Sequence, residues 1–146
     1  MSDAQALTGS IASSHIIKWL RAWYSEAMPD AIDLEIVRQM LPSTPYGAGV
    51  REIKPPVEII GDAFEGMLAR DPDDQAVWGI AYNGKARRER QRFTIAHELG
   101  HFILHRSQKQ SFNCDKQSVH TGIDTLRSIE READDFASNL LMQIGR

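Results

Sequence analysis

The sequence predicts an α+β fold in a single domain, because three kinds of pattern follow one another along the chain. Two stretches with helical spacing of apolar residues come first, short apolar runs bounded by turn residues follow, and two longer helical patterns come last. The 146 residues suit one domain, residues 1–146, with a hydrophobic core of its own. We therefore expect N-terminal helices over about 10–42, a short antiparallel sheet over about 57–83, and helices over about 87–105 and 125–144.

The N-terminal part is expected to hold two helices followed by a loop. Residues 10–24 place apolar side chains, Trp23 among them, at helical spacing. The segment DLEIVRQML has Asp33 as its N-cap and stops at Pro42, which predicts a shorter second helix. The next stretch, PSTPYGAGVREIKPP, contains four of the six prolines and is expected to be a loop.

The middle of the chain is expected to form the sheet. VEIIG, FEGMLAR and AVWGIAYN read as two or three strands, the last two joined as a hairpin across residues 71–74. The helical pattern ARRERQRFTIAHELGHFILHR follows. The polar segment 107–124 is expected to be a loop that leads to the last helix.

Composition limits the compartment and the partners. The single cysteine, Cys114, excludes an intramolecular disulfide and suits a reducing environment. Neither a signal peptide nor a transmembrane run is expected, which makes a cytoplasmic location the expectation. The net charge of -3 gives no general attraction to membranes or nucleic acid, so the basic segment 85–92 is interpreted as a solvated helix start and direct nucleic acid binding is not expected.

The stretch RFTIAHELGHFILH carries three histidines at intervals of four residues. On a helical wheel, His97, His101 and His105 share one side and the aliphatic residues share the other. His97 and His101 are about 6 Å apart along the axis, which lets both imidazoles approach one ion. Glu98 follows His97 directly and would act as general base in this H-E-x-x-H arrangement. A solvated or core-satisfied pair of histidines is the alternative.

Catalytic zinc usually keeps three protein ligands and leaves the fourth position to water. His105 lies about 12 Å from His97 along an unbroken helix, too far to share the ion. We expect His105 to end the helix or to lie at the cleft edge. Tyr82, His105 and His120 are all candidate donors to a transition-state oxyanion, and the sequence does not choose among them.

The last helix offers the third ligand. Glu130 lies at the edge of its apolar face and is favoured over Glu132, which points further from that face. Asp134, one turn after Glu130, resembles the aspartate of the ExxxD motif in gluzincin peptidases, which orients a metal-binding histidine. A solvated acidic helix start is the alternative. His120 and Cys114, in the preceding loop, are the remaining possible metal ligands.

The segments RQRFTIAHELGHFILH and EREADDFASNLLM closely resemble the ImmA/IrrE-type metallopeptidases, over about residues 64–142. By position, the resemblance assigns the metal-binding histidines to His97 and His101, the base to Glu98 and the third zinc ligand to Glu130. Asp134 falls where the family commonly has Asn or Asp. The resemblance implies Zn2+ and a small zincin-like fold, although the family's LLMP is LLMQ here.

The resemblance also implies a function. It indicates a zinc-dependent endopeptidase that cleaves a specific regulatory protein, such as a helix-turn-helix transcriptional repressor or an antitoxin. The alternative is a zinc-containing binding module of a toxin–antitoxin-like or repressor pair that acts without proteolysis. The intact Glu98 favours the enzyme, because a structural metal site has no use for a general base. The short C-terminal continuation favours the binding module.

Overall fold

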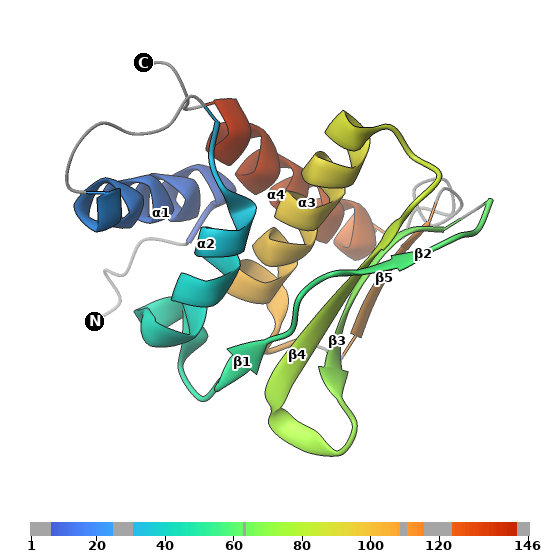
Figure 1. Ribbon diagram of the computed structural model, residues 1–146, viewed down its shortest axis with the longest axis horizontal. Helices are drawn as coiled ribbons and strands as arrows, with labels where there is room; N and C mark the ends of the chain where they lie inside the picture. Colours follow the sequence, from blue (N-terminus) through green and yellow to red (C-terminus); the bar gives the residue numbers. More distant parts are fainter. Residues whose placement is uncertain (1–6, 25–30, 63, 109–110, 116–123, 143–146) are drawn as a thin grey trace.

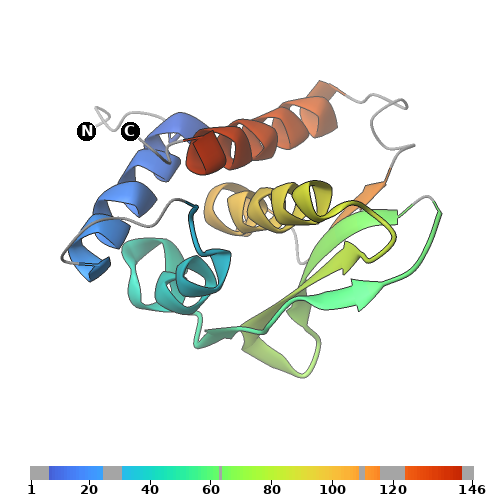
Figure 2. The same cartoon turned by 45° about the horizontal axis from the view of Figure 1, so that its top comes forward.

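The computed structural model describes residues 7–24, 31–62, 64–108, 111–115 and 124–142. Helix α3 (Arg88–His105) lies in the middle of three layers (Figures 1 and 2). Helices α1 (Gly9–Tyr24) and α4 (Asp124–Met142) pack together on one side of it, and the sheet covers the other. The expected α+β class is confirmed, and the arrangement is consistent with a small zincin-like domain.

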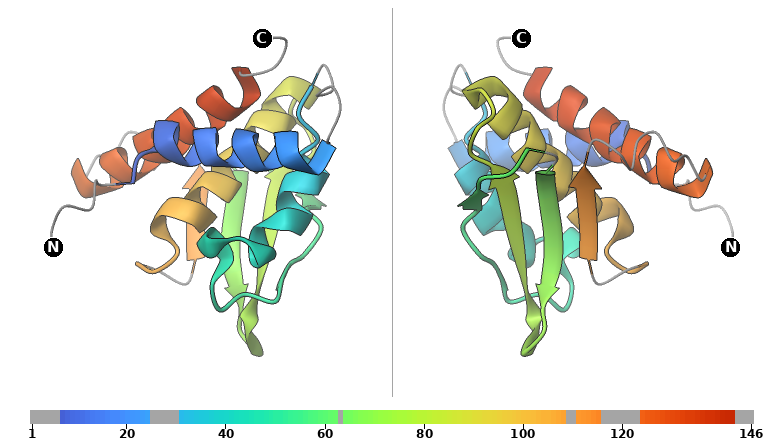
Figure 3. Two further views of the ribbon diagram at one scale, coloured as in Figure 1. Left: turned by 90° about the vertical axis from the view of Figure 1, so that its left-hand side faces the viewer. Right: turned by 90° about the vertical axis from the view of Figure 1, so that its right-hand side faces the viewer.

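Within the described residues, the sheet is mixed and has five strands. Its central strand β4 (Asp74–Asn83) pairs in parallel with β1 (Glu52–Ile53) and β2 (Val57–Ile59), and antiparallel with β3 (Phe64–Asp71). Strand β5 (Ser111–Asp115) pairs antiparallel with the other edge of β3. Figure 3 shows β4, β3 and β5 side by side, with α1 and α4 above them.

The expectation of an antiparallel sheet over 57–83 is correct for its hairpin and wrong for its edges. Asp71 pairs with Asp74 across the predicted hairpin turn. Strands β1 and β5, however, fall in segments expected to be loops. Both are short and gain their order from partners distant in the sequence: Ile53 is buried beside Trp78 on β4, and Phe112 is buried beside Leu68 on β3.

The N-terminal helices follow the sequence closely. Helix α2 (Leu34–Met40) begins after Asp33, whose side chain accepts a 3.0 Å hydrogen bond from the Glu35 backbone N–H. Two short 3-10 turns, Leu41–Ser43 and Pro45–Gly47, then lead to β1. Burial along α1 stops at Leu20, so Trp23, which continues the predicted apolar spacing, is 61% exposed.

Helix α3 is buried on both of its faces. Its apolar residues contribute to the core, and the histidine side, expected to be polar, is enclosed as well: His97, His101 and His105 are 7%, 0% and 1% exposed. The enclosure arises because α4 packs along the helix while the sheet covers it from the opposite layer (Figure 2). Buried imidazoles require polar partners, and the neighbouring elements supply them.

Helix α4 buries the apolar face that the sequence predicts, and leaves its acidic residues toward α3 or solvent. Ala133, Phe136 and Leu140 are fully buried between α3 and α1. A side chain at Gly100 would meet Phe136 and the backbone of Ala133, so this glycine lets α3 and α4 approach closely. Within the described ranges, no helix combines the length and apolar character needed to cross a membrane.

Candidate metal centre

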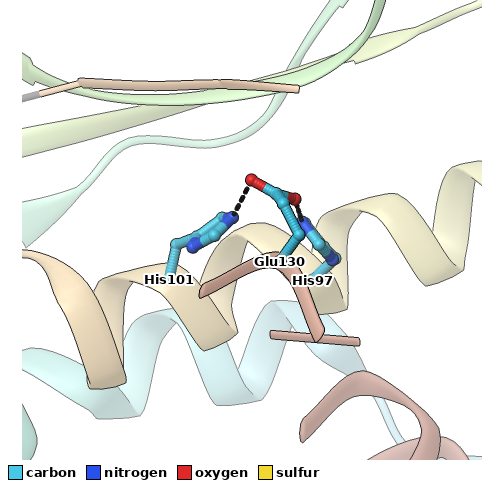
Figure 4. Close-up of side chains that lie close together, drawn as sticks. All are labelled: His97, His101 and Glu130. Atoms are coloured by element: carbon cyan, nitrogen blue, oxygen red, sulfur yellow. Dashed lines mark hydrogen bonds and ion pairs between the residues drawn. The ribbon is translucent and has the colours of Figure 1, made fainter. Parts of the chain in front are cut away.

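Helix α3 brings the first two histidines of the motif together. His97 and His101 are one turn apart, their ring centroids are 4.6 Å apart, and their planes are nearly perpendicular at 88°. Both rings point toward the carboxylate of Glu130 on α4 (Figure 4), and both residues are buried. The sequence-predicted pair is therefore a real spatial pair in a buried position.

Glu130 of α4 lies between the two imidazoles. Its Oε1 is 2.9 Å from His97 Nε2, and its Oε2 is 3.3 Å from His101 Nε2 (Figure 4). One donor atom from each of the three residues lies within 4.8 Å of the others, and no other such group of three or more occurs in the described part of the chain. Two imidazoles and one carboxylate form a donor set typical of catalytic zinc, so the residues fit that metal.

Burial and hydrogen bonding set the charges of this group. Burial alone would lower the pKa of His97, but hydrogen bonds with Asp134 and Glu130 outweigh it and raise the pKa to about 10. Burial lowers the pKa of His101 to about 4, which keeps that imidazole neutral near pH 7. Burial also opposes ionisation of Glu130, yet its interactions with His101 and His97 hold its pKa well below the usual range. Glu130 is therefore ionised near pH 7 and can bind a cation.

Further contacts orient the two imidazoles from behind. Asp134 Oδ1 is 2.7 Å from His97 Nδ1. Asp134 therefore occupies the position expected for an aspartate that orients this histidine. His101 Nδ1 is 2.9 Å from His105 Nδ1. Glu132, the less favoured candidate ligand, instead reaches His105, with its Oε1 2.7 Å from Nε2.

His105 ends α3 as expected, but it does not line an open cleft edge. It is 1% exposed, and both ring nitrogens are engaged, one by His101 and the other by Glu132. With both ring nitrogens engaged by protein groups, His105 has no N–H left to donate to a reacting oxyanion. The oxyanion role considered for His105 therefore stays a prediction, and these contacts do not favour it. His120 and the side chain of Cys114 lie outside the described residues.

Glu98 is fully buried, lies close enough to His97 for its charge to help raise the pKa of that histidine, and faces the backbone of β3. A Cβ atom at Gly66 would lie 2.9 Å from Glu98 Oε2 and 2.5 Å from Thr94 Cγ2, so only glycine fits there without a shift. Sequence reasoning did not select Gly66. The signal was an isolated glycine within a strand pattern, FEGML, which often marks a close approach of backbone.

Two aromatic residues of the sheet also belong to this region. Phe112 of β5 stacks on His101, with centroids 4.8 Å apart and planes at 13°. It was missed because its segment was expected to be a loop. Tyr82 pairs with Gly66 across the sheet, so both residues face α3. Tyr82 thus lies on the helix side, and its oxyanion role stays a prediction.

A pocket of about 360 Å³ opens beside the first turns of α3. Thr94, one turn before Glu98, forms part of its wall together with Phe64. Its charged residues are paired at the rim, with Arg90 2.6 Å from a carboxylate oxygen of Glu65. The pocket therefore offers space for a side chain one helical turn from Glu98, which does not line the pocket itself.

The geometry agrees with the comparison to known protein families. Residues 58–143, more than half of the chain, match the family model described as the IrrE N-terminal-like domain, a peptidase family. The matched segment contains α3 and α4, and hence all three donors of the candidate metal centre. No curated protein matches the chain.

Proposed function

We propose that this chain, which belongs to the peptidase family described as the IrrE N-terminal-like domain, is a zinc-dependent endopeptidase. The observation that carries the proposal is the convergence of His97, His101 and Glu130 within 4.8 Å, next to the buried Glu98. A purely structural zinc site closes all four ligand positions with protein groups. Three donors beside a carboxylate that is not among them favour catalysis.

His97, His101 and Glu130 would hold the zinc ion through Nε2, Nε2 and a carboxylate oxygen. Zinc in such a site supplies Lewis acidity, which makes a water molecule more acidic and polarises a carbonyl group. The protein's own contribution is a rigid and largely dry setting. The two imidazoles are less than one tenth exposed, and α4 fixes the carboxylate from the opposite side.

Glu98 would move the proton that peptide hydrolysis requires. Its carboxylate takes a proton from the attacking water as the new C–O bond forms at the scissile carbonyl. It then delivers this proton to the amide nitrogen as the C–N bond breaks, which leaves an acid and an amine. Because Glu98 is fully buried against β3, its carboxylate is held in one place for both transfers.

The proposed substrate is a specific regulatory protein in the cytoplasm, such as a helix-turn-helix transcriptional repressor or an antitoxin. The likeness of the two helical motifs to ImmA/IrrE-type metallopeptidases supports this choice. The pocket lined by Thr94 and Phe64 offers a place for one substrate side chain, one helical turn before Glu98.

The test compares wild type, Glu98→Gln and Glu89→Gln with the product of a neighbouring repressor gene as substrate. Glu89 is an exposed residue in the first turn of the same helix, so Glu89→Gln is a matched control for the charge change. Glu98→Gln should keep zinc and fold, yet cut the substrate about 10²- to 10⁴-fold more slowly. Equal cleavage by all three proteins would contradict the role of Glu98. An intact cellular phenotype with Glu98→Gln would support the non-proteolytic binding module instead.

A further inference from the structure

A hydrogen-bonded chain leads from the candidate metal centre to the exposed side of α4. His101 Nδ1 contacts His105 Nδ1 at 2.9 Å, and His105 Nε2 contacts Glu132 Oε1 at 2.7 Å. Neither His105 nor Glu132 is used by the proposed reaction. Their contacts nevertheless decide which nitrogen of His101 carries a proton.

The order of the protons follows from the acceptor at the end of the chain. An ionised carboxylate only accepts hydrogen bonds, so His105 must donate to Glu132 through Nε2–H. A neutral imidazole has one N–H, which leaves Nδ1 of His105 as an acceptor. The proton between the two Nδ1 atoms therefore belongs to His101. If His105 instead carried its proton on Nδ1, its Nε2 and Glu132 Oε1 would be two acceptors 2.7 Å apart with no proton between them.

The consequence appears on the opposite side of the His101 ring. With Nδ1 protonated, Nε2 presents a lone pair to Glu130 Oε2, 3.3 Å away. The hydrogen bond that lowers the pKa of Glu130 in the metal-free protein needs a proton on Nε2. With the proton fixed on Nδ1, Nε2 instead offers its lone pair to a zinc ion that Glu130 would also bind. We infer that His105, fixed by Glu132, is a positioning residue that locks His101 in the tautomer presenting Nε2 to the metal. This inference rests on the proposed zinc site.

Packing holds both rings in the required orientation. His101 and His105 are 0% and 1% exposed, and the ring of Phe112 lies 4.8 Å and 6.3 Å from them, centroid to centroid. Helix α4 thus orients both histidines of the pair, His97 directly through Asp134 and His101 through an intervening histidine. A carboxylate behind a ligating histidine fixes its tautomer and raises its basicity, and its loss typically costs about 10- to 100-fold in metal affinity.

The first experiment reads the tautomers directly. Ring ¹⁵N shifts of the zinc-loaded protein, from long-range ¹H–¹⁵N spectra, should show His105 protonated at Nε2 alone and His101 protonated at Nδ1. In Glu132→Ala, His105 should become a mixture of tautomers while the fold is kept, because the Glu132 side chain is about half exposed. A wild-type His105 protonated at Nδ1, or at both nitrogens, would overturn the inference.

The second experiment measures zinc affinity by competition with a chromophoric chelator. His105→Leu removes the acceptor and should weaken zinc binding by about 10- to 100-fold, whereas His105→Gln keeps an acceptor oxygen and should restore most of the affinity. Glu132→Ala should weaken binding more than Asp135→Ala, which removes an equal charge from an exposed position on the same helix.

The outcomes separate this inference from the proposed function. Wild-type protein that binds zinc tightly, with His105→Leu binding equally well, would refute the role of His105 and leave the metal site standing. Wild-type protein that binds no zinc would refute both. If His105→Leu does not fold, the comparison of Glu132→Ala with Asp135→Ala decides the matter, because equal affinities would then refute the inference.

Discussion

A hydrogen bond of 2.7 Å joins Nδ1 of His97 to Oδ1 of Asp134. Asp134 lies one helical turn after Glu130, which contacts the other nitrogen of the same ring at 2.9 Å. One face of α4 therefore holds both nitrogens of His97. Both contacts depend on how α4 is aligned against α3. A shift of either helix would therefore disturb the contacts of His97 with Glu130 and with Asp134 together.

Removal of this support should weaken zinc binding without unfolding the protein. Asp134→Ala should raise the zinc dissociation constant by about 10- to 100-fold, because His97 loses the partner that fixes its ring. The Asp134 side chain is about half exposed, so the thermal midpoint should change little. Chelator competition provides the measurement, and Asp135→Ala is the control. Equal affinities for the two variants would show that Asp134 does not orient the site.

Loss of any one of the three donor residues should weaken zinc binding more than loss of a neighbouring acidic residue. Metal analysis of purified protein should find one zinc per chain, and His97→Ala or His101→Ala should abolish tight binding. Glu130→Ala should weaken binding more than the second-sphere loss of about 10- to 100-fold expected for Glu132→Ala. A larger loss of zinc affinity in Glu132→Ala would show that Glu130 is not the third ligand. Folded wild-type protein without zinc would contradict the metal site altogether.

The pH dependence of the zinc-free protein should report the environment of His97. Its pKa is raised from 6.5 to about 10 by hydrogen bonds that overcome burial. The imidazolium therefore stabilises the folded state fully below about pH 6.5, and this contribution is lost as the pH rises toward 10. The melting temperature of chelator-treated protein should fall over that interval.

The control for this pH effect is Asp134→Asn, which weakens the hydrogen bond that raises the pKa of His97. Its melting temperature should fall less steeply between pH 6.5 and 10 than that of wild type. Zinc must displace the His97 proton, so the wild-type affinity for zinc should rise with pH over the same range. Parallel melting curves for the two proteins would show that His97 is not the titrating group.

The sequence was sufficient for the parts of the fold that local patterns determine. Helical spacing placed α3 and α4 to within a residue or two, and the turn at 71–74 placed the hairpin. The i, i+4 geometry of a helix placed His97 beside His101 before any tertiary contact was known. The position of Glu130 on α4 likewise followed from its place at the edge of the apolar face.

Long-range contacts account for what the sequence did not predict. Strand β5 has no pattern of its own, and only its pairing with β3 makes it a strand. The burial of His105 depends on Glu132, 27 residues later, which supplies the polar partner that makes burial tolerable. The requirement for glycine at position 66 likewise depends on the packing of α3 against β3.

Gly66 supplies the last prediction, because its missing side chain lets β3 approach Glu98. In Gly66→Ala the new Cβ would lie 2.5 Å from Thr94 Cγ2 and 2.9 Å from Glu98 Oε2. Such overpacking should cost about 1–3 kcal/mol of stability. Gly79→Ala is the matched control, because a Cβ at Gly79 in the neighbouring strand meets nothing within 4 Å. It should leave stability unchanged or raise it slightly.

A double variant separates the packing effect from the effect on the proposed base. Thr94→Ser removes Cγ2, the nearest of the atoms that the new Cβ meets, but leaves the contact with Glu98 Oε2. Gly66→Ala combined with Thr94→Ser should therefore regain much of the lost thermal stability while substrate cleavage stays slow, because the carboxylate remains displaced. Melting curves and cleavage rates of the four variants, Thr94→Ser alone included, provide the measurement. Recovery of both properties together would mean that β3 constrains only the packing of α3 and has no influence on Glu98.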